Sequence, residues 1–534
     1  MQGVVNGSMF DIRIVGGTVI DGEGQRGALR DVGIVDGKIA AVATPGSIPL
    51  ESAAETVDAT GRFVTPGFID LHNHADFTIQ GCPQAPSQVA QGVTTLLLGN
   101  CGSSPFPAPN MDEVRRTWGH LDPVFTTEST EAEGFIEATA ELPLEINVAF
   151  QVGFSALRRM AMGNESRAAS PAEVQHMILE LRKAAEAGVR GFSTGLIYAP
   201  GAYAQDEEIN QVVAAAVECG LLYSTHMRDE ADYVLDSVRE SINAIRDTGG
   251  RLQISHIKAT DLHNHGRVSQ ALELIDAARA SGIDVAADVY PYTASSTTMT
   301  ALLPTWLLDE GREAIPGRLV DADVRARAKQ ELADILCGRS GAETVVVASV
   351  SDAGTGGYEW TVGKNLAEIG EEDGCDPAEA ALRVLEAHAA GVAIIHHSMS
   401  EDDVRSALTH PHVAVASDGN KMAATGAGRP HPRSFATFTR VLSHYVRDEG
   451  LLTIEEAVRK MTSLPASRLQ LTDRGVIAEG KAADIAVFDL ESLVEHSTFD
   501  DPWQLTEGVD DVIVGGRFAT RNGSFVYEAG GSVL

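Results

Sequence analysis

Six side chains of the types that bind metal ions follow five of the apolar runs in this 534-residue chain or lie at their ends. They are His72 and His74 in FIDLHNH, Cys101 in TTLLLGNC, His226 in LLYSTHM, His256 in RLQISHIK and Asp418 in VAVASDG. The His-x-His spacing points both imidazoles to one side of a strand. Imidazole nitrogens, a thiolate and a carboxylate together form a ligand set suited to zinc. The pattern therefore predicts a zinc site at the carboxyl ends of strands.

Each of these residues, taken alone, also has a purely structural explanation. A lone histidine at a strand end is more often a hydrogen-bonding residue than a ligand, and a lone Cys101 is more often a small buried hydrophobe. Asp418 in SDG is also typical of a turn or a helix cap. Because all six would have to reach strand ends by coincidence, the shared site is the stronger interpretation. His396 and His397 stay open between the core and a place beside the site.

The runs that carry these residues alternate with amphipathic helical stretches, which is the pattern of βα units around a parallel sheet. Ten runs qualify as strands, whereas a closed (β/α)8 barrel needs eight. We assign the excess to residues 297–391, which have the pattern of a largely helical insertion. In such a barrel the carboxyl ends of the strands converge on one face, where active sites lie. The six residues are therefore expected in one pocket.

The two ends of the chain have a different sequence pattern from the central part. Short β-like runs separated by Gly and Asp turns fill the segment from Asp11 to Val64, and similar runs return in ADIAVFDL and DVIVGGRF. We therefore predict an α/β protein in which a TIM-like barrel covers residues 67–474. A small β-sandwich domain is expected from residues 9–66 and 475–534 together.

Charge and composition narrow the classes of function. The chain has 41 Lys and Arg against 75 Asp and Glu, a net charge of −34, which argues against nucleic acids and anionic membranes as partners. No apolar run approaches the roughly 18 residues that span a bilayer. The five widely spaced cysteines do not form a disulfide framework. We expect a soluble cytoplasmic protein with a small-molecule substrate, and an anionic substrate would require a local cation.

Seven motifs occur in an order that is typical of one enzyme superfamily. They are GFIDLHNHAD, GVTTLLLGNCG, STHMRDE, ISHIKA, ASDG, GRPHPRSFATF and RGVIAEGKAADIAVFD. The chain resembles the amidohydrolase superfamily and, within it, the N-acyl-D-amino-acid deacylases, or D-aminoacylases, from about Asp11 to Tyr527. NCG is the discriminating motif. Most dinuclear relatives use a carboxylated lysine on the fourth strand, whereas GFSTGL has no lysine and Cys101 is available instead.

The resemblance implies zinc-dependent hydrolysis of N-acyl-D-amino acids to a carboxylate and a free D-amino acid. A tightly bound Zn²⁺ would lie on Cys101, His226 and His256. The ligands of a second, weaker position would be His72, His74, Cys101 and Asp418. The resemblance also makes Asp418 the general base, which takes a proton from water and returns it to the leaving amine.

The family acts on molecules with a free α-carboxylate, so the resemblance implies a cation near the metal. Lys258 matches the family's carboxylate-binding lysine, and Tyr290 and Ser296 match its hydroxyl partners. Tyr198 matches a tyrosine near the carbonyl oxygen, although either tyrosine alone is as readily a half-buried aromatic. The chain departs from the family at Ile257, where a histidine is expected. That position alternates away from the site, so we expect little effect on chemistry.

Several alternatives stay open at this point. Arg228 is a second candidate for the carboxylate, or it pairs with Asp229 or Glu230. TALLPTWLL with Met299 favours apolar walls and neutral or hydrophobic D-residues. A dipeptidase acting on L-Xaa-D-Xaa would present the same carboxylate, and a cyclic-amide hydrolase is disfavoured by the missing lysine. A catalytically silent metal-binding protein would have no need of Asp418.

Overall fold

Eight parallel strands form the centre of this computed structural model, which describes residues 9–119, 123–338 and 340–534. In chain order they are β6 (Phe68–Asp70), β7 (Val93–Leu98), β8 (Asn147–Gly153), β9 (Gly191–Gly195), β10 (Leu222–His226), β11 (Arg251–Ile254), β12 (Asp284–Val289) and β16 (Val413–Val415). The outer strands β6 and β16 meet at a parallel bridge between Asn73 and Gly419. The His74 amide donates to the Gly419 carbonyl at 2.7 Å. The sheet thus closes into the predicted (β/α)8 barrel.

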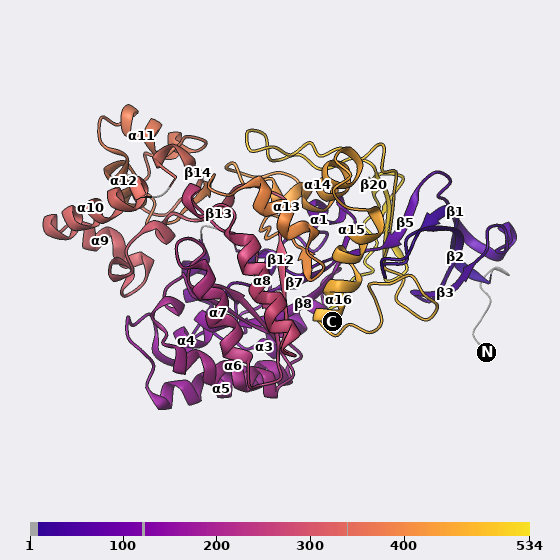
Figure 1. Cartoon of the computed structure of the whole chain (residues 1–534), viewed down its shortest axis with the longest axis horizontal. Helices are drawn as coiled ribbons and strands as arrows, with labels where there is room; N and C mark the ends of the chain where they lie inside the picture. Colours follow the sequence, from indigo (N-terminus) through magenta and orange to yellow (C-terminus); the bar gives the residue numbers. More distant parts are fainter. Residues whose placement is uncertain (1–8, 120–122, 339) are drawn as a thin grey trace.

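Helices pack around this barrel (Figure 1). They are α1 (Pro86–Val89), α2 (Met111–Trp118), α3 (Ala132–Ala140), α4 (Phe154–Met162), α5 (Pro171–Glu186), α6 (Asp206–Glu218), α7 (Val234–Ile245), α8 (Arg267–Ala280), α13 (Glu401–Thr409), α14 (Arg433–Arg440), α15 (Ile454–Met461) and α16 (Ser463–Arg468). Strands β7 and β8 are buried along their whole length, as expected for a parallel sheet that is covered on both faces. The main hydrophobic core lies between these strands and the helices.

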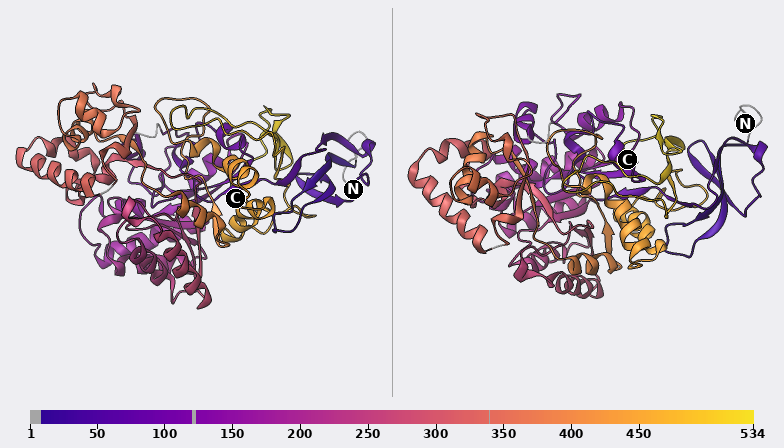
Figure 2. Two further views of the ribbon diagram at one scale, coloured as in Figure 1. Left: turned by 45° about the horizontal axis from the view of Figure 1, so that its top comes forward. Right: turned by 90° about the horizontal axis from the view of Figure 1, so that it is seen from above.

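An insertion between β12 and β16 forms a separate body at one end of the molecule (Figures 1 and 2). Its helices are α9 (Ile315–Leu319), α10 (Ala322–Gly338), α11 (Leu366–Glu372) and α12 (Pro377–Ala387), and its strands are β13 (Ser295–Thr298), β14 (Val345–Val350) and β15 (Val392–His396). The two surplus strand runs of the sequence are β14 and β15, which pair antiparallel with each other. The insertion therefore contains a sheet as well as helices, and this sheet extends beyond residue 391.

The two chain ends meet in a nine-stranded sheet at the opposite end of the molecule (Figure 2). Its strands are β1 (Phe10–Val19), β2 (Ala28–Val35), β3 (Lys38–Ala43), β4 (Ala53–Asp58), β5 (Phe63–Pro66), β17 (Ile485–Phe488), β18 (Val509–Val514), β19 (Arg517–Arg521) and β20 (Ser524–Phe525). Strand β17 pairs antiparallel with β5, where Val487 faces Val64. Across the described chain, no helix combines the length and apolar character needed to cross a bilayer.

Candidate metal centre and active site

The six predicted metal-binding residues lie at the carboxyl ends of five barrel strands. His72 and His74 follow β6, Cys101 follows β7, His226 ends β10, His256 follows β11 and Asp418 follows β16. Cys101, His256 and Asp418 have φ angles of 52°, 35° and 52°. These left-handed conformations are uncommon for residues with a Cβ atom and cluster at functional sites.

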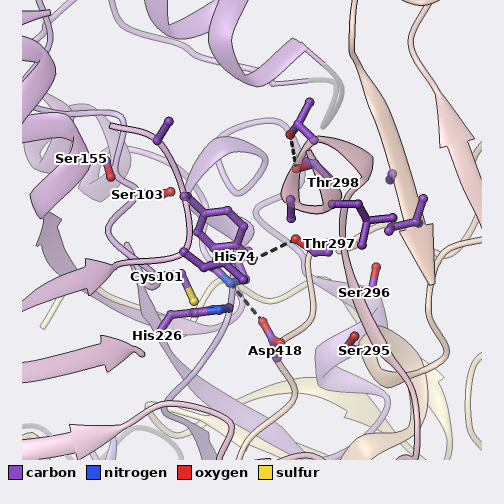
Figure 3. A pocket seen from close by; sticks show the side chains of 18 of the residues that line it. His74, Cys101, Ser103, Ser155, His226, Ser295, Ser296, Thr297, Thr298 and Asp418 are labelled. Carbon is purple, nitrogen blue, oxygen red and sulfur yellow. Dashed lines mark hydrogen bonds and ion pairs between the residues drawn. The ribbon is translucent and has the colours of Figure 1, made fainter. Parts of the chain in front are cut away.

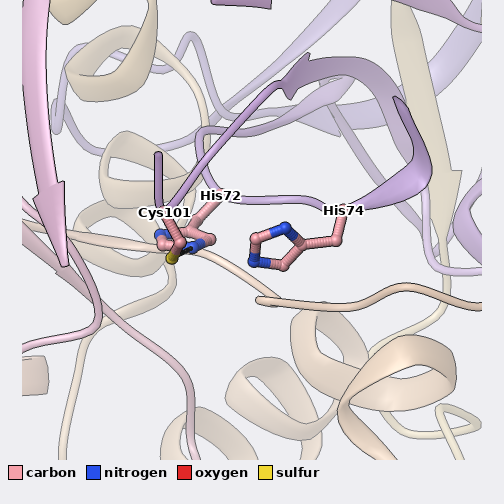
Figure 4. A group of neighbouring side chains, drawn as sticks. All are labelled: His72, His74 and Cys101. Carbon is pink, nitrogen blue, oxygen red and sulfur yellow. Dashed lines mark hydrogen bonds between the residues drawn. The ribbon is translucent and has the colours of Figure 1, made fainter. Parts of the chain in front are cut away.

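The donor atoms of these side chains converge, and Figure 4 shows three of them, His72, His74 and Cys101. The Cys101 sulfur lies 3.2 Å from His72 Nε2 and 3.5 Å from His256 Nε2. Three triads keep their donor atoms within 4.8 Å of one another: Cys101, His226 and His256; His72, His74 and Cys101; and His72, His256 and Asp418. Tetrahedral zinc places nitrogen and sulfur ligands roughly 3.4–3.7 Å apart. The donor set and its spacing therefore fit zinc, and Cys101 is shared between two adjacent positions.

Two carboxylates orient the imidazoles from behind. Asp288 Oδ1 lies 3.3 Å from His72 Nδ1, and Glu230 Oε1 lies 2.9 Å from His256 Nδ1. Because each carboxylate binds the Nδ1 side, the Nε2 atoms are left facing the sulfur, which is how metal-binding histidines are commonly held. The sequence reasoning missed both roles. The available signal was a carboxylate at or just beyond the ends of β12 and β10.

His226 supports the same interpretation. It is buried, and neither of its ring nitrogens makes a hydrogen bond within the described part of the chain. Its Nε2 atom lies 3.4 Å from a Glu230 oxygen. A buried imidazole without hydrogen bonds is costly, and a metal ligand is the role that its neighbours Cys101 and His256 suggest.

Buried charges set the ionisation of the centre. Burial raises the pKa of the Cys101 thiol, but His72 and His256 outweigh it and hold that pKa well below its usual value. Burial also acts against ionisation of Asp418, yet Arg433 and His72 hold its pKa well below the ordinary range. The sulfur is thus poised as a thiolate, the form that binds metals, and Asp418 as an anion.

The predicted carboxylate receptor Lys258 is buried at the same end of the barrel. Its Nζ atom lies 2.8 Å from both oxygens of Glu230 and 2.8 Å from His256 Nδ1. The ammonium is therefore already paired with a carboxylate. Arg228, the other candidate, forms an ion pair with Glu240 at 2.8 Å.

Arg433 is a cation of the site that the sequence reasoning missed. Its guanidinium lies 2.7 Å from Asp418 Oδ2, donates to the Ser296 carbonyl at 3.1 Å and lies over the Tyr290 ring at 4.8 Å. It begins α14, within the motif GRPHPRSFATF. The signal was an arginine shortly after a strand-end aspartate.

These residues surround one cavity of about 280 Å³ (Figure 3). Tyr198, Tyr290, Lys258 and Ser296 all line it, together with Cys101, His226, His256, His74 and Asp418. The Tyr198 ring packs edge-on against His226 at 4.9 Å, and its hydroxyl lies 2.9 Å from the Thr297 hydroxyl.

The cavity wall is mixed: Ala301, Leu302 and Leu308 of TALLPTWLL line it, as expected from the sequence, and so do several hydroxyl groups. Met299 is buried in the core of the insertion and does not line the cavity. Its neighbours Thr298, the last residue of strand β13, and Thr300 do line it and add hydroxyl groups to the wall. His396 also lines the cavity, whereas the His397 ring packs against Phe499.

Known proteins share this architecture and sequence. The sequence profile of the Amidohydrolase family matches residues 55–248 and 353–519. An N-acyl-D-glutamate deacylase of Alcaligenes xylosoxydans xylosoxydans is 37% identical over 509 residues, covering 95% of this chain and 93% of that protein. A D-aminoacylase of the same organism is 33% identical over 528 residues, covering 98% of this chain and 97% of that protein. The crystal structure of N-acyl-D-glutamate deacylase from Bordetella bronchiseptica, complexed with zinc and a phosphonate inhibitor, is 34% identical with a TM-score of 0.84, covering 99% of this chain and 100% of that one. This chain belongs to the Amidohydrolase family.

Proposed function

We propose that this protein is a zinc-dependent hydrolase that cleaves the amide bond of N-acyl-D-amino acids into a carboxylate and a free D-amino acid. The observation that carries the proposal is one cavity lined by a thiolate–imidazole metal centre, an ionised Asp418 and a carboxylate-binding cation, Arg433. The names of the relatives, among them an N-acyl-D-aspartate deacylase 32% identical over 508 residues, support the same substrate class.

The proposed metal ligands fall into two groups. Cys101, His226 and His256 would hold the tight zinc, and His72, His74, Cys101 and Asp418 would hold a second, weaker position. Bound zinc would polarise the substrate carbonyl and make water more acidic.

Asp418 acts as the general base in this proposal and afterwards as the general acid. Its Oδ1 atom lies 3.1 Å from His74 Nε2, so it faces the metal centre, while its Oδ2 atom pairs with Arg433. The carboxylate takes the proton of the attacking water and delivers it to the amide nitrogen as that nitrogen leaves. Tyr198 donates its hydroxyl hydrogen bond to the developing oxyanion.

The α-carboxylate of the substrate binds at the cationic part of the cavity. Arg433 takes it, with support from Lys258, Tyr290 and Ser296. When the substrate carboxylate occupies Arg433, Asp418 loses part of its cationic partner, so its proton affinity rises. Substrate binding thereby makes the base stronger at the moment it is needed.

A hydrolysis screen tests the function directly. N-acetyl-D-amino acids, their L-enantiomers, mixed-chirality dipeptides and hydantoins are incubated with the protein, and zinc is quantified in the same preparation. We expect turnover of the N-acetyl-D-amino acids and at least one zinc per chain. Turnover of hydantoins alone, or zinc content with no amidase activity, would overturn the proposal.

We also propose that the enzyme acts in the cytoplasm. All five cysteines are free in the structure, which is compatible with a reducing compartment. Cell fractionation with an antibody against the chain tests this location.

A further inference from the structure

We propose that the cavity contains a second anion site at Arg159, and that the preferred substrates therefore carry two carboxylates, the α-carboxylate and another. This inference rests on the proposed function and specifies its substrate class. The second carboxylate can belong either to the D-residue side chain or to the acyl group, and both offer the same chemistry to a guanidinium.

Arg159 belongs to the same cavity as the metal centre but to a different wall. It lies on α4, one turn after Ser155, and both residues line the cavity with Trp118. Its guanidinium donates to the Ser155 carbonyl at 3.5 Å and lies 5.8 Å from the Trp118 ring. Arg433 and the metal ligands come from other elements, so the cavity joins two separate cationic regions.

The charge of Arg159 has no close counterion. Within the described part of the chain, no carboxylate oxygen lies within 4.0 Å of its guanidinium, and Glu113 and Glu313 act on it only from farther away. Burial lowers the pKa of Arg159 to about 10, against the opposing effect of these two glutamates. The guanidinium stays charged at neutral pH, but it is desolvated without full compensation.

Two cavity-side or neighbouring arginines that are buried in this protein pair with carboxylates. Arg158, the preceding residue, pairs with Glu208, and Arg433 pairs with Asp418. Arg159, which is half-buried, has no such close partner at the position where a ligand would arrive. In a protein with a net charge of −34, a cation that faces a cavity without its own carboxylate is well suited to an incoming one.

A carboxylate fits the guanidinium better than other anions of similar size do, because its two oxygens match the planar fork of N–H donors. Thr298 and Thr300 add hydroxyl groups to a cavity wall that also contains Ala301, Leu302 and Leu308. A substrate with one carboxylate at Arg433 and one at Arg159 would be held in the cavity at two points.

Two matched substrate pairs distinguish the sources of the second carboxylate. N-acetyl-D-glutamate is compared with N-acetyl-D-glutamine, and N-succinyl-D-leucine with N-succinamoyl-D-leucine. Each pair differs by one charge at nearly constant size. We expect the wild-type enzyme to prefer one of the two dianions over its neutral partner by at least about tenfold in kcat/KM, since hydrogen bonds to charged groups are the stronger class.

The variant Arg159→Gln should lower kcat/KM for that dianion roughly 10- to 100-fold and change the neutral partner less than about threefold. For the same dianion, the kcat/KM of Arg159→Lys should lie between that of the wild type and that of Arg159→Gln. Arg167→Gln is the matched control, because Arg167 is an exposed arginine paired with Glu173 and its loss changes the net charge equally. Thermal unfolding of each variant checks its fold.

The outcomes separate the two proposals. Equal rates on charged and neutral partners in the wild type, or equal losses on both in Arg159→Gln, would overturn the second anion site while leaving the deacylase function intact. The comparison of substrates in the wild-type enzyme tests the second anion site even if the variant misfolds. Failure to hydrolyse any of the four compounds would overturn the function and the inference with it.

Discussion

The two ends of the barrel both bury charged side chains, but they satisfy them in opposite ways. At the amino ends of the strands, Lys460 donates to the His410 and Val413 carbonyls, the latter at 3.0 Å, and Arg468 donates to the Leu252 carbonyl at 2.8 Å. These cations bind the main chain of the strands, and Arg468 also pairs with Asp284. At the carboxyl ends the charged groups bind mainly one another, and neither ring nitrogen of His226 makes a hydrogen bond within the described residues.

This contrast separates stability from chemistry. A cation that is saturated by main-chain carbonyls has no capacity left for a ligand, so it fixes the fold. In a cluster of metal-donor atoms only a few ångströms apart, the atoms repel one another or lack hydrogen-bond partners until a ligand or metal ion binds. Substitutions at the two ends of the barrel should therefore have different consequences for activity, metal content and unfolding.

The largest effect is expected at Cys101, which belongs to two of the three triads of candidate ligands. Cys101→Ala removes the soft ligand shared by both positions and should abolish most bound zinc and nearly all activity. The metal-free variant should unfold at nearly the same temperature as the metal-free wild type, because this end of the barrel is expected to contribute metal binding rather than stability. Elemental analysis measures the bound zinc, and thermal unfolding measures the stability of the variant. Near-normal zinc in the variant would contradict the assignment.

Asp418→Asn should lower kcat by on the order of 10²–10⁴, because asparagine keeps the size of the side chain but cannot take a proton from water. The tight zinc should remain, since the triad Cys101, His226 and His256 does not include this residue. The measurement is steady-state turnover beside metal content. Wild-type kcat, or loss of the tight zinc, would assign the base elsewhere.

A smaller effect is expected at Lys258, which shares its charge with Glu230. Lys258→Met should raise KM for N-acyl-D-amino acids roughly tenfold and should affect the corresponding amides much less, because the amides lack the carboxylate. The double variant Lys258→Met/Glu230→Gln removes both charges. If the double variant restores KM, the lysine acts by neutralising Glu230 rather than by binding substrate.

The smallest effect on turnover is expected at Lys460, at the other end of the barrel. Burial lowers the pKa of Lys460 from 10.5 to about 8 despite Glu456. The unfolded chain therefore binds more protons between these values, so the penalty for burying the ammonium is full below pH 8 and disappears as the pH rises toward 10.5. Lys460→Met should lack this pH dependence.

Denaturant unfolding measures the difference directly. From pH 7.5 to 9.5 the free energy of unfolding of the wild type should gain roughly 2 kcal/mol relative to that of Lys460→Met. Activity at pH 7.5 should stay within about twofold of wild type, because Lys460 is at the barrel end opposite the cavity. A constant difference across this pH range would show that the lysine is not the titrating group.

Much of the barrel and of its candidate metal centre could be predicted from sequence. Eight of the ten strand-like runs became barrel strands, and the proposed ligands followed them because strand ends converge in this fold. The apolar composition of the two others, β14 and β15, does not distinguish them from barrel strands. Only their antiparallel pairing with each other and, for β15, with β13 moved them into the insertion.

The amino-acid sequence by itself determined the ligand types, the strands that carry them and the family, because these follow from local patterns along the chain. The tertiary structure decided which charge meets which. Lys258 pairs with Glu230, which is 28 residues away, and Arg433 pairs with Asp418. Arg159 faces the cavity without a close carboxylate. Such pairings depend on the packing of segments distant in sequence, and charge energies vary steeply with distance and burial, so no local pattern specifies them.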